Sequence, residues 1–273
     1  MDAHIYLDQW GRNFARHLGK FDDSRVKYTS LIANFAHPKR WSAWDAIADE
    51  DLVCAFGIHP VVCAREPGIV VRKEGELRRR LASPRCVALG EIGLDYLRCQ
   101  SDKQRTEQRQ SLYALLRLRP DNLPIVIHCR GGGEALQDCL RILRDRVPAT
   151  TIVQVHCFLG GRAEVGKWQE AFPQCLFSLS HRSLALVGTE AAEHQLAVRS
   201  LSLDRILVES DAPFLGRSAE VQRTSAAPAS PRLDLYQVGE WIGRQKGLCP
   251  SVILQAAGLN AQRAFRIPPG CQP

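Results

Sequence analysis

Residues 86–96 read CVALGEIGLDY, and this stretch contains the pattern that decides the fold. An apolar run, Cys86–Leu89, is followed closely by a residue with chemical function, Glu91. The chain contains eight such apolar runs, which cover residues 1–6, 28–35, 52–58, 86–89, 123–127, 151–155, 175–179 and 205–208. Near-continuous rather than alternating apolar runs predict strands that are buried on both faces, as the strands of a parallel sheet are.

Helical periodicity separates the runs, for example over residues 107–118 and 134–143. Strands that alternate with helices predict right-handed βαβ units. Eight such units in 273 residues match a closed (β/α)8 barrel, the TIM barrel, in number and size. We expect a single domain over residues 1–273, with a short or truncated first strand because only Met1 precedes Asp2. An open doubly wound sheet is the alternative, but no glycine-rich dinucleotide turn follows an early strand.

The composition is that of a globular protein and excludes fibrous, disordered and membrane-spanning classes. Hydrophobic residues are 45% and charged residues 24% of the chain, and no apolar run is long enough to cross a bilayer. Asp2 and His4 follow Met1 closely, without the features of a secretory signal. The ten cysteines contain no C-x-x-C pair, so we expect reduced thiols, no disulfide-linked partner and an intracellular location, in cytoplasm or nucleus. The net charge of +7 suits a phosphate-bearing partner without identifying one.

Polar side chains that can take part in catalysis follow most of the predicted strands. They are His4, Tyr6, His59, Glu91, His128, His156 and Asp211. In a (β/α)8 barrel the carboxyl ends of the strands meet at one mouth, so we expect these side chains to converge there. A single histidine at a strand end is compatible with a packing role, but a repeated set is difficult to explain in that way. The other histidines, His17, His37, His181 and His194, are interpreted as surface or cap residues.

Imidazole and carboxylate groups together form a mixed nitrogen and oxygen site. Such a site suits Zn²⁺ or Mn²⁺, and Mg²⁺ where carboxylates dominate. One or two of these ions can activate water for the hydrolysis of an ester bond. The sequence offers no G-x-S-x-G nucleophile elbow and no cysteine with an evident activating partner. Metal-assisted hydrolysis is therefore the reaction class that the residues favour.

Seven segments of the chain, taken in order, resemble the TatD family of metal-dependent nucleases. They are DAHIYLD (2–8), GIHP (57–60), GEIGLDY (90–96), IHCR (127–130), HCFLG (156–160), ESDAP (209–213) and NAQRAF (260–265). Members of that family are (β/α)8 barrels of the amidohydrolase type that hydrolyse DNA, and sometimes RNA, with divalent metals. The resemblance implies the same fold and the same class of reaction for this chain.

The resemblance also implies roles for individual residues. It makes Glu91 the carboxylate shared between two metal ions, with His128 and His156 completing one metal site. His4 and Asp211 would serve the other site, where Asp211 is also placed to take a proton from the attacking water.

Two further residues are implied to lie near the scissile phosphate, His59 and Arg130. The fork of an arginine matches two phosphate oxygens, although a structural ion pair is the alternative for Arg130. Asp95 and Tyr96 are interpreted as holding Glu91 or lining the mouth, with packing as the alternative for Tyr96.

The chain departs from the family pattern at Tyr6. The first motif of the family is D-x-H-x-H, and Tyr6 stands where the second histidine belongs. A phenol with a pKa of about 10 stays protonated at pH 7 and is a poorer metal ligand than neutral imidazole. We therefore expect one metal to bind well and the second, on the side of His4 and Asp211, to bind weakly or not at all. Catalysis would be reduced rather than necessarily abolished.

The residues predict hydrolysis by metal-activated water, and the resemblance implies a nuclease that cleaves DNA, with RNA less favoured, from 3′ ends. Two alternatives stay open: an impaired barrel that binds nucleic acid or a protein without turnover, and a metal-dependent ester or amide hydrolase, for example one that deacylates charged tRNA. Residues 131–133, all glycine at a predicted helix start, suit either a phosphate cradle or a flexible loop. Residues 216–231, rich in Ser, Ala and Pro, predict a long loop after the last strand.

Overall fold

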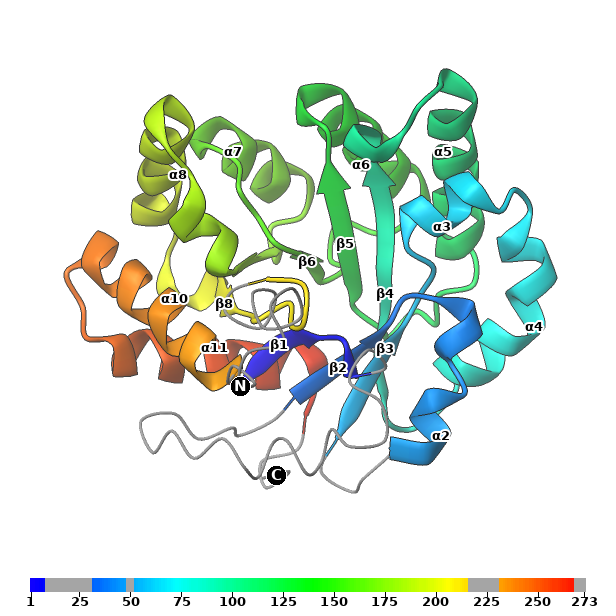
Figure 1. Cartoon of the computed structure of the whole chain (residues 1–273), viewed down its shortest axis with the longest axis horizontal. Helices are drawn as coiled ribbons and strands as arrows, with labels where there is room; N and C mark the ends of the chain where they lie inside the picture. The colour runs from blue at the N-terminus through cyan, green and yellow to red at the C-terminus, as the bar shows by residue number, and fades with distance from the viewer. Residues whose placement is uncertain (8–30, 48–51, 216–230, 268–273) are drawn as a thin grey trace, which may run out of the picture.

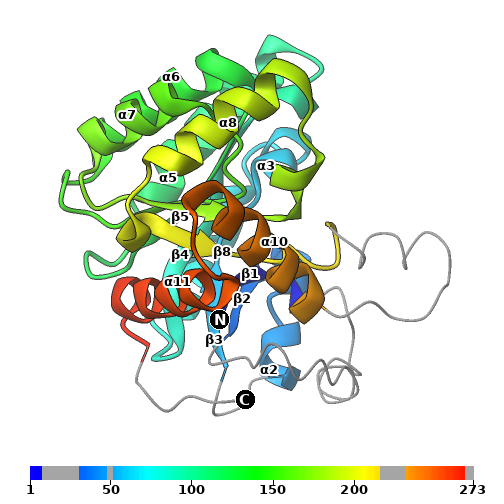
Figure 2. The same ribbon diagram turned by 90° about the vertical axis from the view of Figure 1, so that its left-hand side faces the viewer.

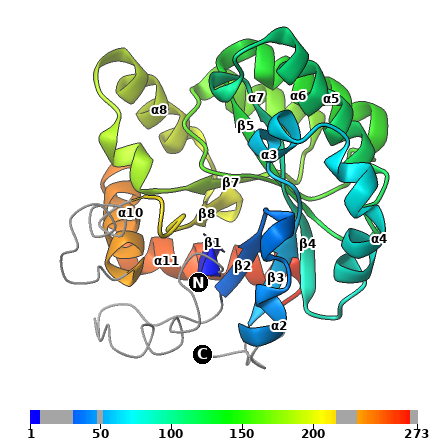
Figure 3. The same cartoon turned by 45° about the vertical axis from the view of Figure 1, so that its right-hand side comes forward.

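The computed structural model describes residues 1–7, 31–47, 52–215 and 231–267. Within these residues, eight strands form one sheet in the order β1 to β8, and each pair of neighbours in that order is parallel. Helices surround the strands, as Figures 1 and 3 show from two directions. The strands are β1 (Asp2–Ile5), β2 (Leu31–Phe35), β3 (Val53–Phe56), β4 (Cys86–Asp95), β5 (Ile125–Arg130), β6 (Val153–Val155), β7 (Leu176–Leu179) and β8 (Ile206–Val208). Each strand overlaps one of the predicted apolar runs, which confirms the predicted (β/α)8 barrel, although β4 extends to Asp95, six residues beyond the predicted run.

The barrel closes between β1 and the segment that follows β8. The backbone N–H of Asp211 donates to the His4 carbonyl oxygen at 3.0 Å, and that of Tyr6 donates to the Ala212 carbonyl oxygen at 2.9 Å. β1 is short, as expected, but all four of its residues are buried. Because it is paired with β2 on one side and bonded to residues 211–212 on the other, the first strand is a full member of the barrel.

The helices follow the strands as a βα repeat requires. The α-helices of the described residues are α2 (Ala43–Ile47), α3 (Pro60–Arg65), α4 (Ile69–Leu81), α5 (Asp102–Leu116), α6 (Gly132–Arg146), α7 (Arg162–Ala171), α8 (Gly188–Ser200), α10 (Pro231–Lys246) and α11 (Pro250–Phe265). Four short 3-10 helices are η3 (Pro38–Arg40), η4 (Tyr96–Arg98), η5 (His181–Ala185) and η6 (Leu203–Arg205). Helix α5 begins five residues before the predicted residue 107, because the Ser101 hydroxyl accepts a hydrogen bond from the Gln104 N–H and caps a first turn whose polar residues lack apolar periodicity.

Helix α6 illustrates how the outer helices pack on the sheet. Its buried side chains recur at helical spacing and are Ala135, Leu136, Cys139, Leu140, Ile142 and Leu143. Burial of one such leucine contributes about 1.5–3 kcal/mol, so this face holds the helix against the strands. A second buried cluster joins Ala261, Ala264 and Phe265 of α11 to side chains from β1, β2, β3, β4, β5, β7 and β8. Figure 2 shows α11 running beside the strands.

Two glycines let the strand that carries Glu91 approach its neighbours. A Cβ atom at Gly57 would lie 2.6 Å from the Glu91 carbonyl oxygen. A Cβ atom at Gly93, whose φ is +144°, would lie 2.0 Å from the carbonyl oxygen of His128. Any side chain at either position would collide with backbone atoms, so the glycines of this region set how closely Glu91 approaches the adjacent strands.

Two further expectations concern membranes and the long loop. In the described part of the chain, no helix combines the length and the apolar character that crossing a membrane requires. The predicted loop 216–231 lies outside the described residues, except for Pro231, which begins α10.

Candidate metal centre

The polar residues at the strand ends meet at the mouth of the barrel, where all of them except the fully buried His4 line one cleft. The cleft has a volume of about 1080 Å³. His4 lies on β1, Glu91 on β4 and His128 on β5, while His156 directly follows β6. His59 precedes α3, and Asp211 lies three residues after the end of β8. The structure therefore brings together the side chains that the sequence predicts to converge, with Glu91 at their centre.

Three imidazoles face the Oε1 atom of Glu91. The Nδ1 atom of His128 lies 2.5 Å from Oε1, the Nε2 atom of His59 lies 3.6 Å away and the Nε2 atom of His156 lies 3.7 Å away. Glu91 itself is fully buried, so this carboxylate has no contact with bulk water. The arrangement concentrates nitrogen donors on one side of a single carboxylate.

The Oε2 atom of Glu91 has different neighbours. The hydroxyl of Tyr6 donates a hydrogen bond to it, and the Nε2 atom of His4 lies 3.5 Å away. The same His4 nitrogen lies 3.8 Å from Oδ1 of Asp211. Tyr6 thus occupies one side of Oε2 with a proton donor, where an imidazole would offer a lone pair.

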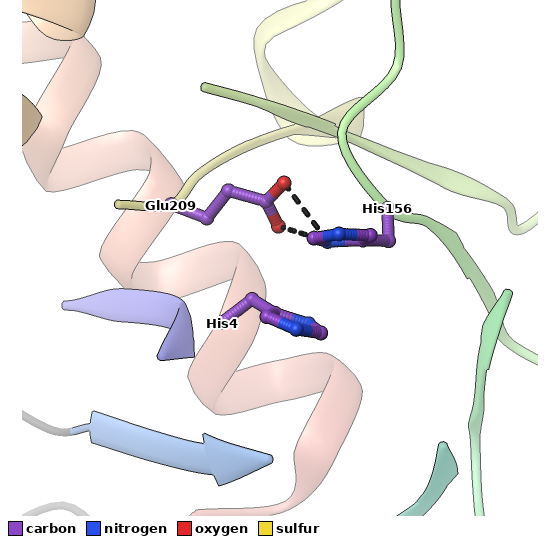
Figure 4. Close-up of side chains that lie close together, drawn as sticks. All are labelled: His4, His156 and Glu209. Atoms are coloured by element: carbon purple, nitrogen blue, oxygen red, sulfur yellow. Dashed lines mark hydrogen bonds and ion pairs between the residues drawn. The ribbon is translucent and has the colours of Figure 1, made fainter. Parts of the chain in front are cut away.

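A residue to which the sequence analysis gave no role, Glu209, orients His156. Figure 4 shows the Glu209 carboxylate beside the ring of His156, whose Nδ1 atom lies 3.0 Å from it. The same buried carboxylate accepts from the Cys157 backbone N–H at 2.7 Å and from the Ser178 hydroxyl at 2.5 Å. In the neutral ring, Nδ1–H donates to Glu209, so Nε2, which faces Glu91, is the nitrogen that keeps a lone pair for a metal. The ESDAP segment contains Glu209, but its role depends on contacts with residues 156–178, which the segment alone does not reveal.

His59 has the opposite arrangement of its ring nitrogens. Its Nδ1 atom accepts from the backbone N–H of Val61 at 3.1 Å, where His59 caps helix α3. In the neutral ring the proton therefore resides on Nε2, the atom that faces Glu91. A protonated Nε2 is a hydrogen-bond donor rather than a metal ligand. This geometry is consistent with a contact to phosphate, the role that the sequence analysis gave to His59.

Asp95 and Tyr96 take different positions. The Oδ2 atom of Asp95 lies 3.5 Å from Nε2 of His128, and Oδ1 accepts from the Arg98 backbone N–H. The hydroxyl of Tyr96 instead donates to Asp138 at 2.6 Å. Asp95 thus contacts a neighbour of Glu91, whereas the Tyr96 hydroxyl is engaged with helix α6.

Arg130 and the glycines after it end strand β5 at the cleft. Arg130 and Gly131 both line the cleft wall. At Gly131, φ is +127° and a Cβ atom would lie 2.6 Å from the Cβ of Tyr96, so close packing requires glycine there. Packing against Tyr96 therefore explains the first of the three consecutive glycines, and no bound phosphate is needed to explain it.

Charge is concentrated on the Oε1 side. Burial opposes ionisation of Glu91, but the positive charge of His156 and the other nearby histidines lowers the pKa of this carboxyl well below its usual range. Burial also opposes protonation of His156, but the carboxylates of Glu209 and Glu91 raise its pKa to about 10. For His128, the charge of Glu91 outweighs burial and raises the pKa to about 9. Both imidazoles are therefore positively charged at pH 7, with a proton on each ring nitrogen, unless a cation displaces one of these protons.

Three other groups are governed by burial. Burial and the charge of His156 lower the pKa of His4 well below its usual range. Burial lowers the pKa of His59 to about 4. Burial raises the pKa of the Asp211 carboxyl to about 8, and the negative charges of nearby glutamates add to this effect. His4 and His59 are therefore neutral at pH 7, and Asp211 titrates near neutrality.

The donor set fits a divalent cation. Several buried polar atoms of the described residues have no hydrogen-bond partner, among them both ring nitrogens of His4, Nε2 of His128 and Oδ1 of Asp211. Leaving such a polar atom without a partner costs about 1–3 kcal/mol. Several unpartnered nitrogen and oxygen atoms close together therefore indicate a site for a ligand. In two groups the ligand atoms all lie within 4.8 Å of one another, namely His59, Glu91 and His128, and His4, His156 and Glu209. Neither group is a complete ligand set by itself. In the first group His59 presents a protonated Nε2 to Glu91, and in the second the hydrogen bonds to Glu209 assign that carboxylate to orienting His156.

One sequence expectation about histidines is wrong. His194 is buried, not a surface or cap residue: its Nδ1 lies 3.0 Å from the Gly160 carbonyl oxygen and its Nε2 lies 2.9 Å from the Ser183 hydroxyl. Its ring also stacks on Trp241. Both ring nitrogens have partners, so this histidine joins α8 to its neighbours, a role that local sequence does not indicate. His37 does cap the helix η3, as expected.

Comparison with known sequences identifies the family. A sequence model described as "TatD related DNase" matches residues 1–266. The chain is 31% identical to the human 3'-5' RNA nuclease TATDN2 over 98% of its own length, but it spans only 35% of that protein. It is also 31% identical to the metal-dependent hydrolase YcfH of Escherichia coli, with 98% of this chain and 96% of YcfH covered. The 3'-5' ssDNA/RNA exonuclease TatD of Erwinia tasmaniensis is 31% identical over 77% of each chain.

Solved structures support the same fold. The TatD homologue YJJV of Escherichia coli superposes with a TM-score of 0.77 at 21% identity, covering 98% of both chains. A TatD family hydrolase of Entamoeba histolytica superposes with a TM-score of 0.65 at 18% identity, covering 86% of this chain and 84% of that one. These likenesses agree with the barrel described above, and the family match confirms the resemblance found in the sequence. The chain therefore belongs to the TatD related DNase family and is a metal-dependent hydrolase of that family.

Proposed function

We propose that this protein is a nuclease that hydrolyses phosphodiester bonds of single-stranded nucleic acid from the 3′ end, with DNA favoured over RNA. The observation that carries the proposal is the cluster of imidazoles and carboxylates around Glu91 at the base of an open cleft. The names of the human and Erwinia relatives, an RNA nuclease and an ssDNA/RNA exonuclease, support the substrate class. The net charge of +7 suits a polyanionic substrate. We place its action inside the cell, in cytoplasm or nucleus.

The residues that would hold a divalent cation, Zn²⁺, Mn²⁺ or Mg²⁺, are Glu91 and those of its neighbours that offer a lone pair once a proton is displaced. His128, His156 and Glu91 itself form the stronger set, and His4 and Asp211 form the weaker one. When bound, a divalent cation supplies Lewis-acid activation of water and of a phosphoryl oxygen.

The remaining chemistry belongs to side chains. The ionised form of Asp211 is suited to accept a proton from water at Oδ1, since burial raises the pKa of this carboxyl to about 8 and a general base works best when its pKa is near the working pH. His59 donates from Nε2 toward the phosphate, and the guanidinium of Arg130 offers two parallel donors to phosphate oxygens. Arg130 and His59 thus position the phosphate, and Asp211 takes the proton that the attacking water loses.

Tyr6 reduces the number of cations that the site binds. Its hydroxyl donates to Oε2 of Glu91, so this oxygen is already occupied by a hydrogen bond on the His4 side. We propose that one cation binds tightly beside Oε1 and that a second binds weakly or not at all. This feature also favours the second candidate function, a barrel of reduced activity that holds nucleic acid without turning it over.

The proposal is tested by degradation of short oligonucleotides that carry a label at the 5′ or the 3′ end, with added Mn²⁺ or Mg²⁺. We expect stepwise shortening from the 3′ end, and we expect Glu91→Gln to lower the rate by at least about a thousandfold. Glu170→Gln, at an exposed glutamate of α7, is the matched control and should leave the rate unchanged. An aminoacyl ester offered in competition distinguishes the ester hydrolase alternative. A wild-type protein that binds the oligonucleotides but cleaves none of them with either metal would contradict the proposal and support the binding module.

A further inference from the structure

Phe214 is an exposed aromatic side chain on the wall of the catalytic cleft. Its relative exposure is 50%, and within the described residues it is the aromatic side chain that remains exposed, since the others are buried or half-buried. Exposing a phenyl ring to water forgoes the free energy that burial would give it. Phe214 lines the cleft that contains Glu91, so its exposed face is turned to the space that a substrate would fill.

The ring is held in a fixed place by the turn that carries Asp211. The backbone N–H of Phe214 donates to the Asp211 carbonyl oxygen at 2.9 Å, which closes the turn. Two further backbone hydrogen bonds attach this turn to β1, one to His4 and one from Tyr6. The Phe214 ring packs edge to face on the Tyr6 ring, with centroids 5.0 Å apart. The Tyr6 ring therefore lies between Phe214 and the Glu91 carboxylate. Phe214 also shares a hydrogen-bonded turn with Asp211, the candidate general base.

Cationic side chains lie on the opposite wall. Arg65 ends helix α3 and Arg98 ends η4, so both belong to the β3–β4 side of the mouth, whereas Phe214 follows β8. Neither guanidinium has a carboxylate within ion-pair distance in the part of the chain that the structure describes. The two walls thus differ in chemistry, with an aromatic face on one and unpaired positive charge on the other.

Acidic side chains limit the paths that a polyanion can take. Glu164 on α7 and Glu190 and Glu193 on α8 line the cleft on the side of β6 and β7. These carboxylates repel a phosphate backbone, apart from the local effect of Arg182 on η5. The favourable path therefore runs from the β8 side, past Glu91, to the β3–β4 side.

We propose that Phe214 is the platform on which the terminal base of a single-stranded nucleic acid stacks, while the backbone leaves the cleft over Arg98 and Arg65. An aromatic platform combined with a positively charged track is how proteins bind single strands without reading their sequence. A base at the end of a blunt duplex is hydrogen-bonded to its partner, so it cannot enter the cleft without the second strand. This inference rests on the proposed function. It states that the cleft recognises the unpaired terminal nucleotide of a strand, and that recognition requires the base of that nucleotide.

The test measures binding of 5′-fluorescein oligonucleotides by fluorescence anisotropy with Mn²⁺ present, using a phosphorothioate at the terminal linkage to resist hydrolysis. One probe ends in a 3′ adenine, a second ends in an abasic residue and a third is a blunt duplex. We expect the wild type to bind the adenine probe about tenfold more tightly than the abasic probe, the loss that removal of one stacked base produces. Phe214→Ala should bind both single-stranded probes equally, and Phe214→Trp should restore the difference. Leu259→Ala, at an exposed residue of α11 outside the cleft, is the control and should keep the wild-type difference.

The outcomes separate this inference from the proposed function. If Phe214→Ala still prefers the adenine probe, or if the duplex binds as tightly as the single strand, the platform is wrong even when the wild type hydrolyses DNA. If the wild type shows the preference but hydrolyses no oligonucleotide, the platform stands and the proposed nuclease activity fails. If the wild type binds none of the three probes, both are overturned.

Discussion

The two oxygens of the Glu91 carboxylate belong to different chemical environments. Oε1 faces three imidazoles, and two of them, those of His128 and His156, have pKa values raised to about 9 and about 10 by nearby carboxylates. Oε2 faces one imidazole, that of His4, whose pKa is lowered by burial, and it accepts a hydrogen bond from Tyr6. One side is thus rich in basic nitrogen, and the other is largely occupied by a phenol.

This difference indicates that the Oε1 side of Glu91 offers more metal ligands than the Oε2 side. We propose that Glu91, His128 and His156 form a set of three ligands that binds one catalytic cation and leaves room for water. On the Oε2 side, Tyr6 presents a hydroxyl donor instead of a nitrogen ligand, and the same ring packs against Phe214. We infer that the Oε1 side retains metal chemistry and that the Oε2 side has become part of the wall for the substrate.

Of the effects that this difference between the two oxygens predicts, the largest is a dependence of metal affinity on pH. The pKa values of His128 and His156 are about 9 and about 10, so both imidazoles are protonated at pH 7 and a cation must displace at least one proton from them. Affinity should therefore rise with pH, by about tenfold per unit for each proton displaced, or at least about 100-fold from pH 6 to pH 8. Calorimetric titration in buffers of different ionisation enthalpy counts the protons released. Affinity that is flat over this range would show that the ligands are not protonated imidazoles.

A smaller effect is expected at Glu209, which orients His156. Glu209→Gln keeps the shape of the side chain but removes the charge that raises the pKa of His156. We expect metal affinity to fall by about 10- to 100-fold, the usual cost of losing such a partner. Glu209→Asp retains the charge and should lose less. If Glu209→Gln binds metal as tightly as the wild type, Glu209 has no part in orienting the ligand.

The smallest effect is expected from restoring a nitrogen donor on the Oε2 side. Tyr6→His should raise metal content from about one ion per chain to about two, and it should raise the nuclease rate several-fold because a second cation helps to stabilise the leaving oxygen. Tyr6→Phe removes the hydroxyl without adding a ligand, so its metal content should stay near one. Elemental analysis of the purified variants gives the counts. Equal metal content and equal rate in Tyr6→His and the wild type would remove the basis for an impaired half of the site.

The sequence predicted the strands well because each is decided by local burial. Apolar runs such as residues 86–89 need no information from elsewhere in the chain to be recognised. Since strand ends in a parallel barrel share one rim, the positions of Glu91, His128 and Asp211 followed from the strands. The first turn of α5 was not predicted, because a serine cap and polar residues begin a helix without apolar periodicity.

The details of the site depend on contacts between distant segments, and these could not be predicted. The role of Glu209 requires β7 and the end of β6 to place Ser178 and His156 beside it. The proton of the neutral His59 ring lies on Nε2 because Nδ1 accepts from the backbone N–H of Val61. That N–H points at the ring because helix α3 begins there. The burial of His194 likewise depends on packing of α8, although its sequence resembles a surface helix.

The most direct test of this account is a crystal structure of the wild-type protein grown with excess Mn²⁺, with anomalous differences measured at the barrel mouth. We predict one strong peak, on the Oε1 side of Glu91 within ligand distance of His128 and His156, and a weak peak or none on the side of His4 and Tyr6. Two peaks of equal height on both sides of Glu91, or no peak at either oxygen, would contradict it.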